Sequence, residues 1–196
     1  MSAKKRKIIK LFVIIAMALA LLLITYFVLA RIIKSNNEIK LDYEFYVPTE
    51  EEDYLNDPKY LSKDRTLHYT DSTGQQWYID QDTSCTEIGA IFFRLYFLAI
   101  EQGDAATLND MYKKELGNYV SFTPQRVYQK EVVYLYDERI DDDTFSITYS
   151  VDYNIMKNDG SFRRDIGSDM SRTQYITLYY NEEGAWIEEV KAEYRK

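Results

Sequence analysis

The residues of this chain that could do chemistry are densest in the segment FRRDIGSDMSR, at positions 162–172. The charged members of this segment are Arg163, Arg164, Asp165, Asp169 and Arg172. Paired charges on a long connection between predicted strands suit the recognition of another molecule. We therefore expect the cluster to form a partner-contact edge. The alternative is a set of exposed ion pairs, each of which contributes little to stability.

Side chains for metal binding or nucleophilic catalysis are sparse. The sequence contains no nucleophile elbow, no phosphate-binding glycine-rich loop, no HExxH and no CxxC. His68, the only histidine, is expected on a strand surface. Cys85, the only cysteine, excludes an intrachain disulfide, and its role stays open between a partly buried residue, a reactive thiol and an intermolecular bridge. We expect no metal site and no cofactor, because the acidic run 50–53 lacks the spacing and glycine of a calcium loop.

One apolar segment, Leu11–Ala30, has the length of a membrane span. Its twenty residues carry no charge, and as a helix they would cover about 30 Å. The five charged residues before Leu11 are all basic, which predicts a cytoplasmic N-terminus and an extracytoplasmic C-terminal part. A cleaved signal peptide is the alternative. Cleavage after Ala20 would leave an apolar start on the mature chain, so we expect an uncleaved signal anchor.

Charge and length restrict the part of the chain beyond the span. The formal net charge is −8, and removing the five basic residues before Leu11 leaves −13 for the rest, which disfavours binding of nucleic acid. About 160 residues remain after the span, enough for one domain. The predicted organisation is a basic cytoplasmic tail at 1–10, a transmembrane anchor at 11–33, an acidic stalk at 34–65 and an extracytoplasmic domain at 66–196.

The domain is predicted to begin with a hairpin at 66–79, followed by two helices within 84–116. A capping-box pattern at Ser84 and Glu87 predicts the start of the first helix, and Gly103 its end. Apolar residues spread over a broad arc of this helix, so we expect neighbouring elements to cover most of it. Asp104 is expected to cap a second helix, Ala105–Leu116.

Beyond residue 125 the period of the apolar residues changes from that of a helix to that of a strand. Short turns between successive strands predict an antiparallel meander over 125–194, and hence an α+β domain with a helix pair packed in a curved antiparallel sheet. The expected strands and connections are 127–136, 145–155, a hairpin turn at 157–160 followed by its second arm at 161–166, then 173–180 and 186–194.

The order of elements resembles the nuclear transport factor 2-like superfamily. The residues that carry the resemblance are Tyr96-Phe-Leu-Ala-Ile-Glu-Gln-Gly103-Asp104, with Leu108 and Met111-Tyr112 further along, in a region from about 84 to 194. The resemblance implies a cone in which a curved sheet wraps the first helix. It also implies a catalytic alternative, since in the ketosteroid-isomerase branch a tyrosine at the position of Tyr96 donates to an oxyanion. The carboxylate base of that branch has no counterpart at 120–122.

These observations predict a single-pass bacterial envelope protein whose domain binds a protein partner, a second copy of itself or a small hydrophobic ligand without turnover. The layout is similar to that of inner-membrane assembly subunits of type IV secretion and conjugation machines, which suggests an envelope assembly component. A homodimer is expected through the open face of the sheet. The alternative function is a membrane-tethered isomerase or dehydratase that uses Tyr96.

Overall fold

The computed structural model describes residues 43–47, 56–79, 85–113 and 117–192. All of them belong to one compact unit, Tyr43–Lys196. The predicted anchor Leu11–Ala30 and the basic tail lie outside the described residues. Among the residues described, no helix is both long and apolar enough to cross a membrane.

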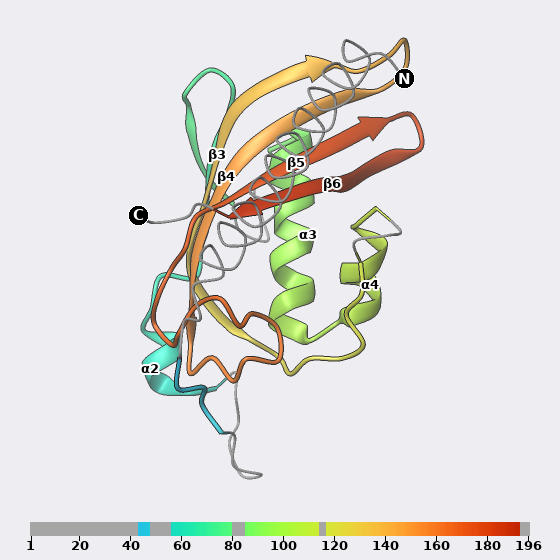
Figure 1. Ribbon diagram of the computed structural model, residues 1–196. Coiled ribbons are helices and arrows are strands. Elements are labelled where there is room, and N and C mark those ends of the chain that lie inside the picture. The colour runs from blue at the N-terminus through green and yellow to red at the C-terminus, as the bar shows by residue number, and fades with distance from the viewer. Residues whose placement is uncertain (1–42, 48–55, 80–84, 114–116, 193–196) are drawn as a thin grey trace, which may run out of the picture. The chain divides into compact units, whose positions relative to one another are not determined.

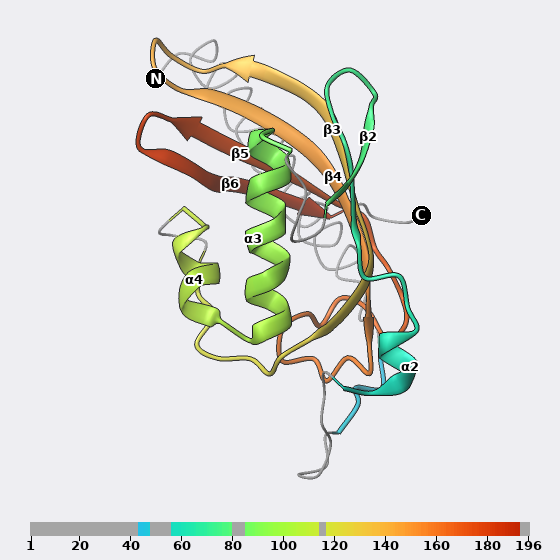
Figure 2. The same ribbon diagram turned by 180° about the vertical axis from the view of Figure 1, so that it is seen from behind.

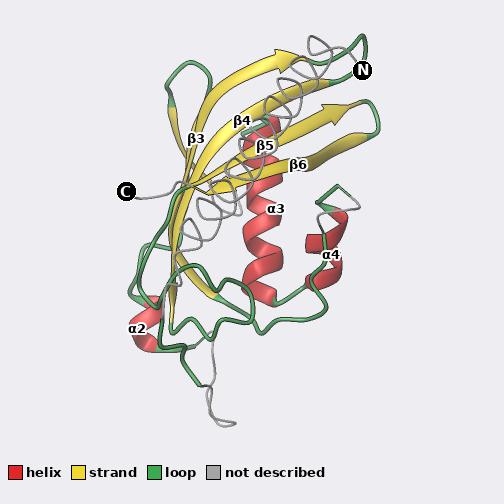
Figure 3. Cartoon of the chain, in the orientation of Figure 1, coloured by secondary structure: helices red, strands yellow, loops and turns green. Residues whose placement is uncertain are grey.

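A single mixed sheet of six strands organises the described unit (Figures 1 and 3). The strands bend around the helices α3 and α4, which lie side by side on one face of the sheet (Figure 2). The predicted α+β class with a curved sheet is therefore confirmed. The strand order is β2-β1-β3-β4-β5-β6, with the bounds β1 Leu67–Thr70, β2 Gln76–Ile79, β3 Arg126–Arg139, β4 Phe145–Met156, β5 Gln174–Asn181 and β6 Gly184–Ala192.

Strands β3 to β6 form the predicted antiparallel meander. The prediction of an entirely antiparallel sheet is wrong at one pair, because β1 runs parallel to β3, with Leu67 opposite Lys130. Parallel neighbours need a crossover connection. The helices between β2 and β3 provide it. Short turns between neighbouring strands could not reveal this long-range pairing.

Helix α3, Ile88–Gln102, presents its aromatic side to the concave face of the sheet. It ends where predicted, at Gly103, whose φ of +68° is a left-handed conformation that glycine adopts without strain. The capping box is not formed as expected. The N-cap is Glu87, whose side chain makes no capping hydrogen bond, and Ser84 lies outside the described residues.

Helix α4, Ala105–Asp110, is capped by Asp104, whose carboxylate accepts a hydrogen bond of 3.0 Å from the Thr107 amide. The predicted end at residue 116 was too late. The backbone after α4 instead pairs with β6: the Ile187 amide donates to the Met111 carbonyl at 2.7 Å, and the Lys113 amide donates to the Ile187 carbonyl at 2.9 Å. Bonding to a sheet edge thus replaces the next helical turn.

Part of the predicted stalk packs on the domain. A short helix, α2 Pro58–Leu61, buries Tyr60, whose hydroxyl donates to the Val127 carbonyl at 3.0 Å. The Tyr46 amide donates to the Asn158 carbonyl at 2.9 Å. The folded unit therefore begins well before residue 66, because Tyr60 is buried against β3 and the half-buried Tyr46 is bonded to the loop after β4.

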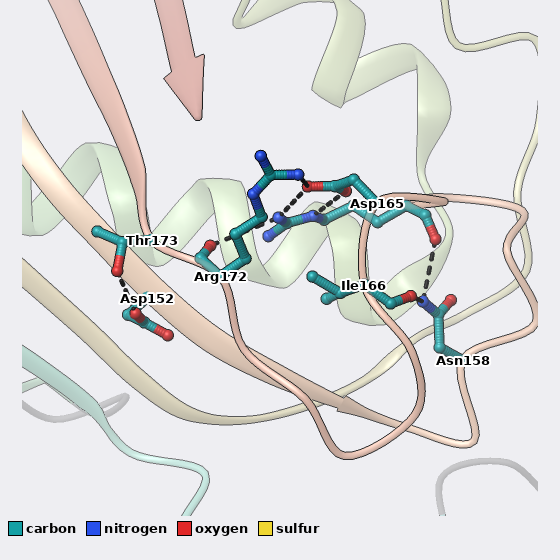
Figure 4. A network of polar contacts seen from close by, with 7 residues as sticks. Asp152, Asn158, Asp165, Ile166, Arg172 and Thr173 are labelled. Carbon is teal, nitrogen blue, oxygen red and sulfur yellow. Dashed lines mark hydrogen bonds and ion pairs between the residues drawn. The ribbon is translucent and has the colours of Figure 1, made fainter. Parts of the chain in front are cut away.

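The connection between β4 and β5 contains no strand at 161–166, contrary to the expectation. Asn158, which is fully buried, donates to the carbonyls of Arg163 at 3.0 Å and Ile166 at 2.9 Å (Figure 4). Its own side-chain oxygen accepts from the Gly160 amide at 2.9 Å. One buried amide therefore satisfies the backbone groups that a strand would have paired.

The predicted hairpin at 66–79 is present as β1 and β2. Asp71 holds its turn: the carboxylate accepts hydrogen bonds from the Thr73 hydroxyl at 2.6 Å, the Gln75 amide at 3.0 Å and the Trp77 indole at 2.8 Å. These bonds, that from Thr73 first, lower the pKa of Asp71 from 3.8 to about 2.

This lowered pKa predicts a pH dependence of stability. A carboxylate with a depressed folded-state pKa stabilises the fold above its unfolded pKa, and that contribution is lost as the pH falls from about 4 to about 2. Asp71→Asn keeps an acceptor oxygen but removes the titration. The free energy of unfolding, measured by urea titration of the detergent-solubilised chain with tryptophan fluorescence, should therefore fall less steeply over this range in the variant. Equal slopes for the two chains would contradict the assignment.

Candidate functional site

Tyr96, the catalytic candidate, lies in the aromatic core between α3 and the sheet. Its side chain is only 1% exposed, and its ring packs edge-on against Phe93 and Phe97. Burial raises the pKa of Tyr96 well above its ordinary value, and the neighbouring Tyr112 hydroxyl adds to this effect. The hydroxyl is therefore neutral and enclosed by other side chains, which is the environment of a core tyrosine.

The predicted charged cluster is only partly at the surface. Arg163 is 5% exposed, and its guanidinium holds both oxygens of Asp165, with Nε–Oδ1 at 2.9 Å and Nη2–Oδ2 at 2.7 Å (Figure 4). Arg172 lies 3.7 Å from the same carboxylate. Burial would raise the pKa of Asp165, but the hydrogen bonds and charge of Arg163 outweigh it and lower the pKa. This part of the cluster ties the loop to the domain.

The other two members also make contacts within the loop region. Asp169 accepts a hydrogen bond of 2.8 Å from the Tyr128 hydroxyl on β3, and its amide donates to the Ile155 carbonyl at 2.8 Å. Arg164, which is exposed, donates to the Gly160 carbonyl at 3.1 Å. Of the five residues, Arg163, Asp165 and Arg172 contact one another, whereas Arg164 and Asp169 contact other parts of the domain. A role of the cluster as a contact edge for a partner stays a prediction.

One face of α3, a helix expected to be covered on most sides, is open. Three large apolar residues of α3 expose almost half of their side chains: Ile91 49%, Leu95 49% and Leu98 43%. Together with Ile88, which is half-buried, they succeed one another at intervals of three, four and three residues. We call these four residues the α3 seam. Their regular spacing was visible in the sequence, but nothing in it distinguished them from the buried residues of the same helix.

Two hollows flank the α3 seam. On the side of α4, a hollow of about 350 Å³ is lined by seam residues together with Thr107, Asp110, Met111 and Ala185. On the side of β2, a hollow of about 140 Å³ is lined by seam residues with Ile79, Cys85 and Arg94. The seam is thus a ridge between two grooves. A second helix can pack against such a surface by placing its own side-chain ridges in the grooves.

A larger hollow of about 750 Å³ lies at the C-terminal end of α3, where it meets β1 and β3. Four cationic residues line it, Lys63, Arg65, Arg94 and Lys130, and three of them contact neighbouring side chains. Lys130 Nζ lies 2.7 Å from Glu101 Oε1, the Lys63 ammonium lies over the Tyr128 ring at 4.9 Å, and the Arg65 guanidinium lies over the Tyr60 ring at 5.3 Å. These contacts stabilise the wall of the hollow.

A bulge in β3 places Lys130 in this hollow. The register of β3 against β4 shifts between Tyr128 and Glu131, and the intervening Gln129 has a φ of +50°. The Gln129 amide leaves the ladder and donates to the Asp64 carbonyl at 2.8 Å. The bulge therefore turns Lys130 toward Glu101 on α3, an effect that strand periodicity alone does not predict.

The described residues hold no group of three or more histidine, cysteine or acidic side chains that could bind a metal. His68 lies on β1, where it was predicted, half exposed and 3.0 Å from the Asp64 carboxylate. Cys85 is a free, partly buried thiol three residues before α3. Within the described part of the chain, neither residue belongs to a group of potential metal ligands.

Among the described residues, the α3 seam with its two grooves is the candidate site, and its exposed side chains are apolar. Apolar ridges of this kind on soluble domains mark places where another molecule binds. No protein-family model, curated protein or solved structure matches the chain, so the arrangement of its own residues is what bears on its function.

Proposed function

We propose that the chain is a membrane-anchored, extracytoplasmic binding domain that docks a protein through the α3 seam and has no catalytic turnover. The observation that carries the proposal is the exposure of Ile91, Leu95 and Leu98 on one face of a helix whose other face is buried. An exposed row of this kind lowers its free energy when another surface covers it. An assembly role in the cell envelope would use the same surface.

The proposed location of the domain, outside the cytoplasmic membrane, rests on the N-terminal sequence. Leu11–Ala30 is apolar over twenty residues, and the charges before it are all basic. In a bilayer such a segment is expected to form a spanning helix with its basic end in the cytoplasm. The domain would then face outward. Its excess of acidic residues and its single cysteine are both compatible with an extracytoplasmic location.

The fold we propose is the nuclear transport factor 2-like cone. Support comes from the curved sheet around α3, from the break at Gly103-Asp104 and from the antiparallel strands β3 to β6. The chain departs from the simplest version of that fold, because the β1–β2 hairpin precedes α3 and β1 joins the sheet in parallel.

The catalytic alternative at Tyr96 receives no support from its surroundings. An oxyanion donor must reach the substrate, whereas the Tyr96 side chain is 1% exposed among aromatic rings. The polar groups beside the Tyr96 hydroxyl are the hydroxyls of Tyr112 and Tyr153, neither of which can act as a carboxylate base. Tyr96→Phe is therefore expected to leave the binding behaviour of the domain unchanged.

Site-specific photo-cross-linking in intact cells tests the proposal. A photoreactive phenylalanine analogue at position 95 should give a cross-linked adduct. The same analogue at Val120 should not, because this residue is 96% exposed but lines neither groove of the seam. Ile91→Asp combined with Leu98→Asp should abolish the adduct, because charges would replace the apolar contacts on either side. Protease added to the same cells should degrade the domain. The absence of any adduct at position 95, or protection from protease, would contradict the proposal.

A further inference from the structure

We propose that the occupant of the α3 seam is a second copy of this chain, whose own α3 lies parallel to the first. This inference rests on the proposed function and names its partner. Three observations carry it: the spacing of the seam, the grooves beside it and the positions of the charges on its two flanks.

The spacing selects a helix as the occupant. Intervals of three, four and three residues are those at which helices interlock along a left-handed crossing, with each side chain entering a gap on the other helix. Ile88, Ile91, Leu95 and Leu98 provide three such intervals, about one and a half heptads. The α3 helix of a second copy has the same spacing of apolar residues. The seams of two copies can therefore interlock with each other.

The grooves give the contact room on both sides. The hollows of about 350 Å³ and 140 Å³ run along the seam, one toward α4 and one toward β2. A two-fold axis would place the groove of one copy against the ridge of the other. The seam is short, so the pairing is expected to be weak in dilute solution and favoured between copies tethered in one membrane.

The charges select the parallel arrangement. Arg94 lines the groove toward β2, Asp110 lines the groove toward α4, and Leu95 borders both grooves. Parallel helices bring opposite flanks together, which places Arg94 of one copy beside Asp110 of the other. Antiparallel helices centred on Arg94 bring like flanks together, with Arg94 against Arg94 and Glu87 against Glu101.

Cysteine cross-linking of the full-length chain in membranes distinguishes the two arrangements. In a Cys85→Ser background, Ile91→Cys, Leu95→Cys and Leu98→Cys are each treated with a short bis-maleimide. Parallel pairing places each residue beside its own equivalent, so all three variants should give a band of twice the chain mass. In antiparallel pairing only position 95 meets itself, because the other equivalents are separated by about 10 Å along the axis. Val120→Cys is the matched negative control.

Charge reversal tests the flanks independently of the seam. In the Leu95→Cys chain, Arg94→Glu and Asp110→Arg should each lower the cross-linked fraction about threefold to fivefold, because each brings like charges together. The double reversal should restore it to within about twofold, since the pair is then opposite again. Both positions are exposed, so the variants are expected to fold, and circular dichroism of each chain checks this.

The outcomes separate this inference from the proposed function. Cross-linking at position 95 alone, or a double reversal that restores nothing, overturns the parallel arrangement. Photo-adducts at position 95 whose mass is that of the chain plus a different protein, with no doubled band from any cysteine variant, overturn the second copy as the occupant and leave the docking role in place. The lack of both kinds of product overturns both.

Discussion

Replacing Arg163 with serine should lower the free energy of unfolding by about 3 kcal/mol. The substitution removes the two hydrogen bonds that hold Asp165 and leaves that carboxylate partly buried with only the more distant Arg172 nearby. Breaking a buried ion pair from one side is strongly destabilising, and we place this case at the lower end because the Asp165 side chain is 36% exposed. Urea titration of the detergent-solubilised chain, followed by the fluorescence of Trp77 and Trp186, measures the change.

The neighbouring position provides a matched control. Arg164→Ser changes the formal charge by the same amount, but this arginine is exposed and donates to a single carbonyl at 3.1 Å. Its effect is expected to stay within about 0.5 kcal/mol. Comparable losses for the two variants would mean that net charge, and not the bond between Arg163 and Asp165, determines the stability of the loop.

Replacing Gly89 with alanine should destabilise the domain by about 2 kcal/mol, although the same change inside an unconstrained helix is favourable by about 1 kcal/mol. A Cβ at this position would overlap the Tyr149 hydroxyl oxygen and lie only 2.6 Å from the ring carbon that bears it. Tyr149 cannot move aside easily, because its ring is buried against Phe93, Tyr69 and Tyr134. Urea unfolding of the full chain again measures the effect.

Tyr149→Phe identifies the source of this effect. Without the hydroxyl the closest contact disappears, so Gly89→Ala should be less harmful in that background than in the natural chain, and the two substitutions should not be additive. An alanine that stabilises the natural chain would show that α3 can shift away from β4. That outcome would contradict the close packing of α3 on the sheet.

Local patterns were sufficient for several elements. The end of α3 at Gly103 and the cap of α4 at Asp104 follow from the conformations and hydrogen bonds that these residue types favour within a few positions. The alternation of apolar residues located β4 to within one residue of its observed end. The turn of the β1–β2 hairpin was likewise correct, because Asp71 and its neighbours are bonded within six positions.

Features that depend on distant segments were not accessible from such patterns. The parallel pairing of β1 with β3 joins residues more than sixty positions apart. The end of α4 is set by the backbone of Ile187, and the loop at 157–173 is organised by one buried asparagine in place of a second hairpin. In each case a remote partner competes with the local conformation and satisfies the same backbone groups.

The candidate site divides in the same way. The sequence by itself determined that a broadly apolar helix exists, that Tyr96 and Arg163 are of types able to bind or react, and that a basic tail and an apolar segment precede them. Only the tertiary structure decided that Tyr96 and Arg163 are buried and that Ile91, Leu95 and Leu98 are exposed. The physical reason is that helical spacing defines which residues share a face, whereas the sheet, α4 and the loop define which face remains in contact with water.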